Sequence, residues 1–151
     1  MTIREARIDD AAFVASLVPR FVEHGAADGH TPGEVIAGTT RVLHGALAEP
    51  RAGDVFLIAE DERGIRAGFL YAVIERDFFT GEPYLHVSEI AVERSGDGAG
   101  DRLMAAAEAS ARERGFRFIT LNVVEENRAA MRFYERRGYG PGHRHFVKRV
   151  D

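Results

Sequence analysis

Apolar residues recur along this chain with two periods, and their alternation predicts strands interleaved with helices. Runs of alternating or continuous apolar residues, bounded by turn residues, predict strands at residues 3–7, 55–60, 67–76, 84–92, 116–124 and 145–150. Helical spacing predicts helices from about residue 10 to 21, then at 32–47, 98–114 and 127–137. Gly115 and Gly138 follow the last two helices, where a left-handed residue commonly ends a helix.

The predicted element boundaries also favour a fold class. Asp9 or Asp10 is expected to cap the first helix, and Pro32 is expected to open the second. The strands at 55–60 and 67–76 are joined by a short polar turn and are therefore expected to pair antiparallel. We predict one domain over residues 1–151, with a mixed α/β or α+β sheet.

Three alternating glycines follow the strand that ends at residue 92, and an alanine-rich helix follows them: Gly96, Gly98 and Gly100. Glycines let backbone N–H groups crowd together, and a helix N-terminus adds unpaired N–H groups and partial positive charge. The pattern predicts a phosphate cradle, although a plain strand-to-helix turn would also explain it. It is neither a dinucleotide fingerprint, because residue 101 is Asp, nor a P-loop, because the only lysine is Lys148.

Composition narrows the classes of function. The chain has 151 residues, 45% hydrophobic and 29% charged, which suits one soluble domain with one core. Without an apolar run of roughly 18 residues or a signal peptide, we expect a cytoplasmic protein with no membrane partner. The net charge of −4 argues against a nucleic-acid partner. The chain has no cysteine to serve as a nucleophile, and its histidines lack metal-ligand spacing, so no metal site is expected.

A more specific pattern extends from the glycines toward the C-terminus. The run Glu-Ile-Ala-Val at 89–92 precedes them, and Leu-x-Val-x-x-x-Asn-x-x-Ala-x-x-Phe-Tyr-x-x-x-Gly-Tyr spans 121–139. Together they resemble the GNAT superfamily of acetyl-CoA-dependent N-acetyltransferases, over residues 84–140. The resemblance implies a GNAT-like fold, with a central, mostly antiparallel sheet that is splayed between two strands and flanked by about four helices.

The resemblance also implies that acetyl-CoA binds as co-substrate between the two splayed strands. Backbone groups at 90–92 would pair with the pantetheine arm, and N–H groups at 96–100 would hold the pyrophosphate. The implied binding residues are Ile90, Ala91, Val92, Arg94, Gly96, Asp97, Gly98, Ala99, Gly100, Asp101, Asn127, Ala130, Phe133 and Tyr134. The loop is about two residues shorter than is usual in the family. Because Ser95 occupies the usual Arg/Gln position, either Arg94 or the backbone alone is expected to compensate.

Tyr134 lies at the position of the family's general acid and is expected to hydrogen-bond the departing thiolate of CoA; the alternative is a packing role. The general base is left open between two residues. Glu89 is the first candidate because a carboxylate inside an apolar strand is costly to keep without a use. His86 is the second, and it would lie on the opposite face of a regular strand. Asn122, at a position where some relatives carry a glutamate, cannot accept a proton.

We therefore expect an N-acetyltransferase that transfers the acetyl group of acetyl-CoA to a primary amine, on a small molecule or a peptide, by direct attack. The alternative is a catalytically inactive acyl-CoA-binding or interaction module with the same fold. The acceptor pocket is expected to come from the loop at 24–32, the second helix and the loop at 78–84, whose aromatic and acidic residues suit a small cationic amine. Dimerisation is common in the family, and a homodimer is one expectation for this chain.

Overall fold

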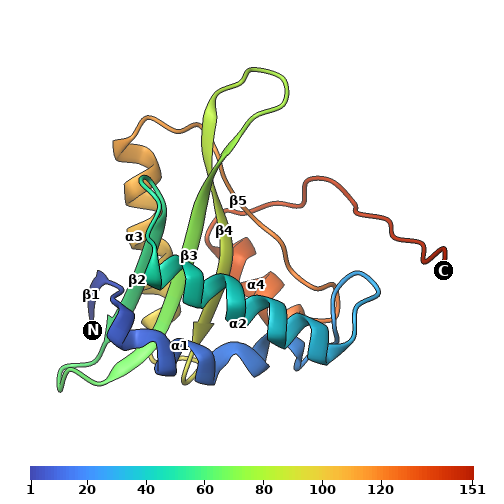
Figure 1. Cartoon of the computed structure of the whole chain (residues 1–151). Helices are drawn as coiled ribbons and strands as arrows, with labels where there is room; N and C mark the ends of the chain where they lie inside the picture. The colour runs from blue at the N-terminus through green and yellow to red at the C-terminus, as the bar shows by residue number, and fades with distance from the viewer.

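The computed structural model describes all 151 residues and places a five-stranded sheet between two layers of helices (Figure 1). The strands are β1 (Thr2–Glu5), β2 (Val55–Glu60), β3 (Arg66–Arg76), β4 (Pro83–Val92) and β5 (Ile119–Leu121). The helices are α1 (Ala11–Leu17), α2 (Pro32–Ala48), α3 (Ala99–Glu113) and α4 (Arg128–Arg136), with short 3-10 helices η1 (Ile8–Asp10) and η2 (Val18–Val22). None of the helices has the length and apolar character that a membrane crossing requires.

The strands lie in the order β1-β2-β3-β4-β5, antiparallel throughout except for the parallel pair β4–β5. Each face of the sheet has its own core, so β3 is buried on both faces over residues 67–72. One core packs α3 against the sheet through Leu70, Leu85, Leu103 and Met104. The other packs α1, η2 and α2 through Val14, Leu43, Ile58 and Phe69. The mixed sheet and the four helices confirm the predicted fold class.

A bulge in β4 changes which way its side chains point. Tyr71 of β3 pairs with Glu89, but the next residue of β3 pairs with Val87, which leaves Ser88 as the extra residue. Paired residues share a face of the sheet, and His86 pairs two residues further along β3, opposite Val73. His86 and Glu89 therefore lie on the same face, and the expectation of opposite faces, which assumed a regular strand, is wrong.

The splay between β4 and β5 is also visible in the pairing. Only Leu85–Val87 of β4 pair with β5, so the remainder of β4, up to Val92, has no strand partner on that side. The predicted strand at 116–124 is shortened to three residues, and residues 122–124, which follow β5, line the opening instead of pairing with β4. This opening positions the candidate site.

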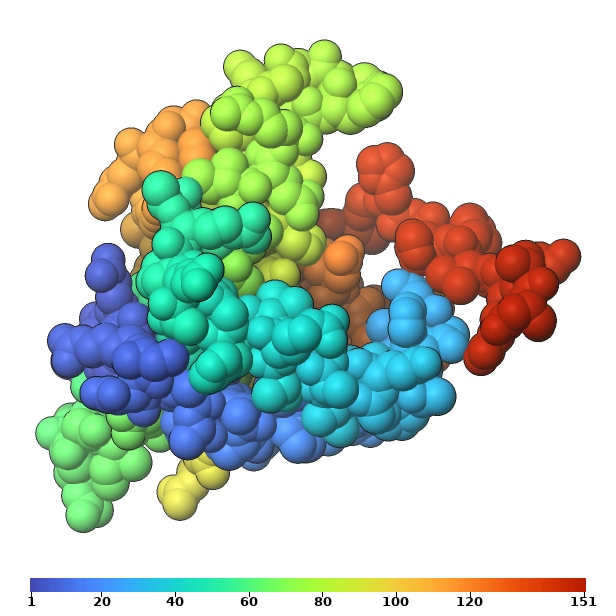
Figure 2. Space-filling model, viewed as in Figure 1, coloured from blue at the N-terminus to red at the C-terminus, as the bar shows by residue number.

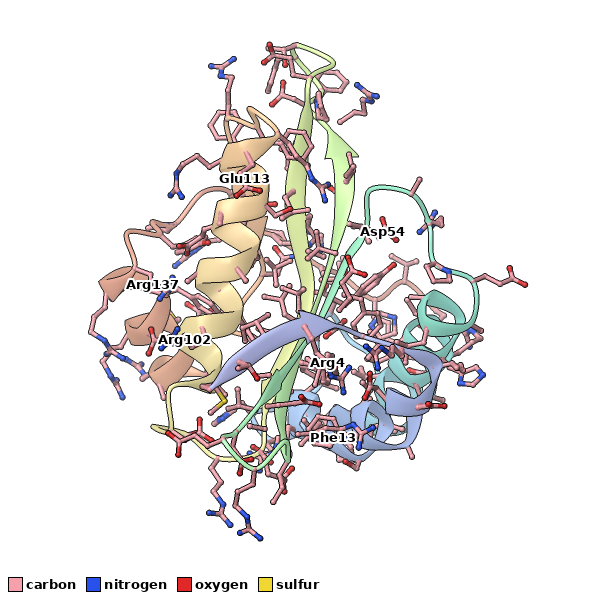
Figure 3. All side chains as sticks on the ribbon, turned by 90° about the vertical axis from the view of Figure 1, so that its left-hand side faces the viewer. Arg4, Phe13, Asp54, Arg102, Glu113 and Arg137 are labelled. Atoms are coloured by element: carbon pink, nitrogen blue, oxygen red, sulfur yellow. The ribbon has the colours of Figure 1, made fainter.

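Charged contacts hold α4 beside α3, on the face that Figure 3 shows. The Arg137 guanidinium donates from Nη1 to Asp101 Oδ1 and from Nη2 to Glu108 Oε2, both at 2.9 Å. The Tyr139 hydroxyl donates to Glu108 Oε1 at 3.1 Å. These contacts fix the C-terminal end of α4 against α3, so that α4 forms one wall of the opening.

The N-terminal helix differs from its prediction in two respects. It ends at Leu17 and continues as the 3-10 helix η2, where Pro19 cannot donate an α-helical hydrogen bond. Asp10 makes no side-chain cap to α1 and is instead buried, accepting from Arg4 Nη1 at 2.8 Å and Arg66 Nε at 2.6 Å. The nearby guanidiniums hold the pKa of its carboxyl well below the usual range, mainly through the hydrogen bond from Arg4.

The predicted strand at residues 145–150 is wrong. Residues 140–151 have no regular structure and make no backbone hydrogen bond to the rest of the chain, and they form a separate arm in Figure 2. The Phe146 side chain is 85% exposed. An alternating pattern needs a neighbouring strand to form a ladder, and no strand pairs with the arm. Arg144 in the arm forms an ion pair with Glu125 at 3.7 Å.

Candidate functional site

A cleft of about 640 Å³ opens where β4 and β5 part. Its walls are the unpaired end of β4, the glycine loop that leads into α3, the segment after β5, the inner face of α4, and η2. The sequence-predicted residues that line it are Glu89, Ile90, Ala91, Val92, Arg94, Gly96, Asp97, Gly98, Gly100, Asp101, Asn127, Ala130, Phe133 and Tyr134. The fold therefore brings together residues from two segments that are separated by α3 and β5 in the chain.

Two predicted residues, Ala99 and His86, do not line the cleft. Ala99 is fully buried under the sheet, and its N–H donates to the Asp97 side chain at 2.9 Å. His86 lies in the paired part of β4, with Nδ1 2.7 Å from Thr120 Oγ1 of β5. The close pairing of β4 and β5 at this point keeps the imidazole out of the opening.

The glycine loop presents free backbone donors to the cleft. Gly96 and Gly98 have φ angles of 85° and 89°, which L side chains rarely adopt, and Gly98 is the residue before α3. The N–H groups of Gly96, Gly98 and Gly100 make no hydrogen bond within the chain. Such donors at a helix N-terminus suit a phosphate group. The loop therefore fits the pyrophosphate that the sequence resemblance implies.

Glu89 is a carboxyl in the cleft wall without a partner in the chain. No hydrogen bond or ion pair involves its side chain, and burial raises its pKa from 4.5 to about 7. The cause is desolvation alone, which disfavours the charged carboxylate. Glu89 therefore changes its protonation state close to neutral pH, as a proton acceptor in catalysis must.

Tyr134 contributes a hydroxyl that stays protonated. Burial raises its pKa to about 12, and its hydroxyl makes no hydrogen bond within the chain. The ring packs against Phe133 and Tyr139, with centroids 5.1 and 5.8 Å away. Asn127 caps the helix two turns earlier, where its Oδ1 accepts from the N–H of Ala130 at 3.2 Å. The helix thus fixes a neutral donor in the cleft wall.

Several lining residues were not among those predicted for cofactor binding or catalysis: Arg20, Phe21, Glu23, His24, Val87, Ser88, Ser95, Leu121, Asn122, Val123, Val124, Ala129 and Arg136. No local sequence pattern marks the lining residues of η2 and of the two residues after it, because they reach the cleft only through the packing of η2 on the sheet. His24 is the one lining residue of the loop at 24–32, which was expected to form the acceptor pocket. No group of three or more acidic or histidine side chains could hold a metal ion.

The second loop expected at the acceptor pocket, residues 78–84, is not in the cleft. Pairing of β3 with β4 continues to Arg76 and Pro83, and this long hairpin carries the loop away from the body (Figure 1). Phe78 and Phe79 at the tip are 92% and 87% exposed. The expectation that these aromatic residues line the acceptor pocket is therefore wrong.

Comparisons with known proteins identify relatives of this chain. Residues 26–139 match the model of the acetyltransferase (GNAT) family. The uncharacterized N-acetyltransferase YhfO of Bacillus subtilis (strain 168) is 30% identical over 141 residues, which covers 92% of this chain and 89% of YhfO.

Two solved structures share the fold. One is named "putative acetyl transferase from Pyrococcus furiosus" and superposes with a TM-score of 0.77 at 23% identity, covering 99% of both chains. Aminoglycoside N-acetyltransferase AAC(6')-Iy in complex with CoA superposes with a TM-score of 0.70 at 19% identity, covering 99% of this chain and 93% of the other.

Proposed function

Because the chain belongs to the acetyltransferase (GNAT) family, we propose that it is an N-acetyltransferase that transfers the acetyl group of acetyl-CoA to a primary amine by direct attack. Family membership supports acyl transfer in general. One observation about the cleft supports the specific route: it combines an unpartnered carboxyl whose pKa is about 7 with an unpartnered hydroxyl that stays protonated. A proton acceptor for the amine and a donor to the departing thiolate both assist amine attack on a thioester.

Glu89 is the proposed general base. An alkyl amine with a pKa of about 10.4 is mostly protonated at neutral pH, and removing its proton costs about 4 kcal/mol. A carboxylate with a pKa of about 7 is a stronger base than one at 4.5, by about 3 kcal/mol. Burial of Glu89 therefore favours proton transfer from the attacking amine, directly or through one water molecule.

Tyr134 is proposed to stabilise the leaving group by a hydrogen bond. A C–N bond forms between the amine and the acetyl carbon while the C–S bond breaks, and the electron pair of that bond goes to sulfur. A thiol has a pKa of about 8.5, so moving the proton from Tyr134 to the thiolate would be uphill by about 5 kcal/mol. Tyr134 therefore keeps its proton and donates to the developing thiolate, while the proton of the amine goes to Glu89.

The backbone is proposed to hold the rest of acetyl-CoA. The free N–H groups of Gly96, Gly98 and Gly100 would bind the pyrophosphate. The unpaired side of β4 from Ile90 to Val92 would accept the amide-containing pantetheine arm in the manner of an added strand. Both interactions use backbone groups, so they tolerate the Ser95 that stands where the family usually has Arg or Gln.

Two measurements test the proposal: calorimetric titration with acetyl-CoA, and thiol release in the presence of an amine panel. The panel contains an aminoglycoside, a linear polyamine and peptide α-amines, since solved structures with this fold are named for aminoglycoside and ribosomal-protein-alanine acetylation. We expect binding, and release with at least one amine. Binding without release on any amine would favour the inactive acyl-CoA-binding module. An absence of binding would refute both functions.

A further inference from the structure

One half-buried cation in the cleft lacks a counter-charge. Four arginine side chains in this protein are half-buried: Arg4, Arg20, Arg66 and Arg137. Arg4 and Arg66 share the carboxylate of Asp10, at 2.8 and 2.6 Å, and Arg137 pairs with two carboxylates of α3, both at 2.9 Å. Arg20 has no carboxylate partner; its single side-chain hydrogen bond goes to a backbone carbonyl.

That hydrogen bond fixes Arg20 at the start of the glycine loop. Arg20 lies in η2, and its Nη2 donates to the carbonyl of Glu93 at 2.6 Å. Glu93 is the first residue after β4, and its own N–H donates to Ala67 of β3 at 2.8 Å, so the acceptor is anchored to the sheet. The guanidinium is therefore held where β4 becomes the loop that carries Gly96 and Gly98.

The Arg20 guanidinium has N–H donors that make no hydrogen bond within the chain. Arginine carries five N–H donors, and the bond to Glu93 uses one. Arg20 lines the same cleft as the glycine loop, whose free N–H groups also favour an anion. Arg20 carries a positive charge that no carboxylate neutralises, and a planar guanidinium matches the geometry of phosphate oxygens. Arg20 and the loop donors thus point to one shared anionic ligand.

We propose that Arg20 binds the pyrophosphate of CoA from η2, beside the start of the glycine loop. This inference rests on the proposed function. The short loop offers only Ser95 and the exposed side chain of Arg94. Arg20 supplies the positive charge from a different element, already oriented by its bond to Glu93. An arginine that is held in place before binding loses less conformational entropy when the ligand arrives.

The test is calorimetric titration of CoA, dephospho-CoA and pantetheine into wild type, Arg20→Gln and Arg20→Lys. Arg41→Gln, which removes an exposed arginine from α2, controls for the change in net charge. We expect Arg20→Gln to weaken the binding of CoA and of dephospho-CoA about tenfold each. The affinity for pantetheine should stay unchanged, because pantetheine has no phosphate. Arg20→Lys should lose less than Arg20→Gln, and Arg41→Gln should behave as wild type.

Three outcomes would overturn the assignment. Unchanged CoA affinity in a folded Arg20→Gln protein would show that Arg20 does not contact the cofactor. A loss of affinity for CoA but not for dephospho-CoA would show that Arg20 contacts the 3′-phosphate and not the pyrophosphate. Equal loss for pantetheine would mean that Arg20 only supports the loop through Glu93. A wild-type protein that binds no CoA would instead refute the proposed function, and this inference with it.

Discussion

Replacing Glu89 with Gln separates two consequences of burying this carboxyl, which are a cost in stability and a gain in basicity. Burial raises the pKa of Glu89 from 4.5 to about 7, with no cation or donor to oppose the shift. Each pKa unit corresponds to about 1.4 kcal/mol. Ionised Glu89 therefore destabilises the folded protein by about 3 kcal/mol well above pH 7. Gln keeps the shape of the side chain and is neutral at every pH.

The stability difference between the two proteins is expected to depend on pH. The unfolded chain releases the proton of Glu89 at lower pH than the folded chain does, so the free energy of unfolding of wild type falls between about pH 4.5 and 7. The Gln variant lacks this loss. In urea denaturation, the free energy of unfolding of Glu89→Gln relative to that of wild type should increase by at most about 3 kcal/mol between pH 4.5 and pH 8. A difference that is constant over this range would refute the raised pKa.

Whereas Glu89→Gln should gain stability at high pH, it should lose activity there. The kcat/KM of wild type is expected to rise with pH through about 7 as Glu89 ionises, and this limb should be absent from Glu89→Gln. Loss of a general base typically costs about 10²- to 10⁴-fold, with little change in the Kd for acetyl-CoA. His86→Gln is the matched control, since His86 lies on the same face but outside the cleft. If Glu89→Gln keeps the wild-type profile, or if the control loses the limb, Glu89 is not the base.

Three further substitutions test the leaving-group donor, the glycine loop and the buried ion pairs. Tyr134→Phe should lower kcat about 10²- to 10³-fold without weakening acetyl-CoA, because the hydroxyl acts on charge that appears only as the C–S bond breaks; a wild-type rate would return Tyr134 to packing. Gly98→Val forces a β-branched residue to a φ of 89° and should weaken acetyl-CoA binding about tenfold by calorimetry; unchanged affinity in a folded variant would exclude the loop from the site. Asp10→Asn leaves Arg4 and Arg66 short of a buried counter-charge and should cost about 3 kcal/mol in urea denaturation, whereas a loss below about 1 kcal/mol would contradict a stabilising role for the carboxylate.

Local signals predicted most of the elements, and the resemblance to the GNAT superfamily predicted most of the cleft. The strand at Val55–Glu60 has the predicted bounds, α2 begins at Pro32 as expected, and Asn127 caps α4. These features depend on residues a few positions apart in the chain: an apolar period, a proline without an N–H group, and a side-chain oxygen three residues before the amide that it accepts from. The resemblance to the GNAT superfamily, which rests on motifs in the glycine loop and α4, predicted most of the residues that line the cleft.

The tertiary structure decided the features that depend on contacts between distant segments. The extra residue Ser88, which puts Glu89 and His86 on one face, is defined only by the pairing of β4 with β3. Arg20 reaches Glu93 across 73 positions of the chain, and Asp10 meets Arg66 across 56. The strand pattern at 145–150 forms no strand because no neighbouring strand pairs with it. Sequence periodicity reports which face of an element is apolar, but a hydrogen bond, a counter-charge or a strand partner comes from whichever segment the fold brings alongside.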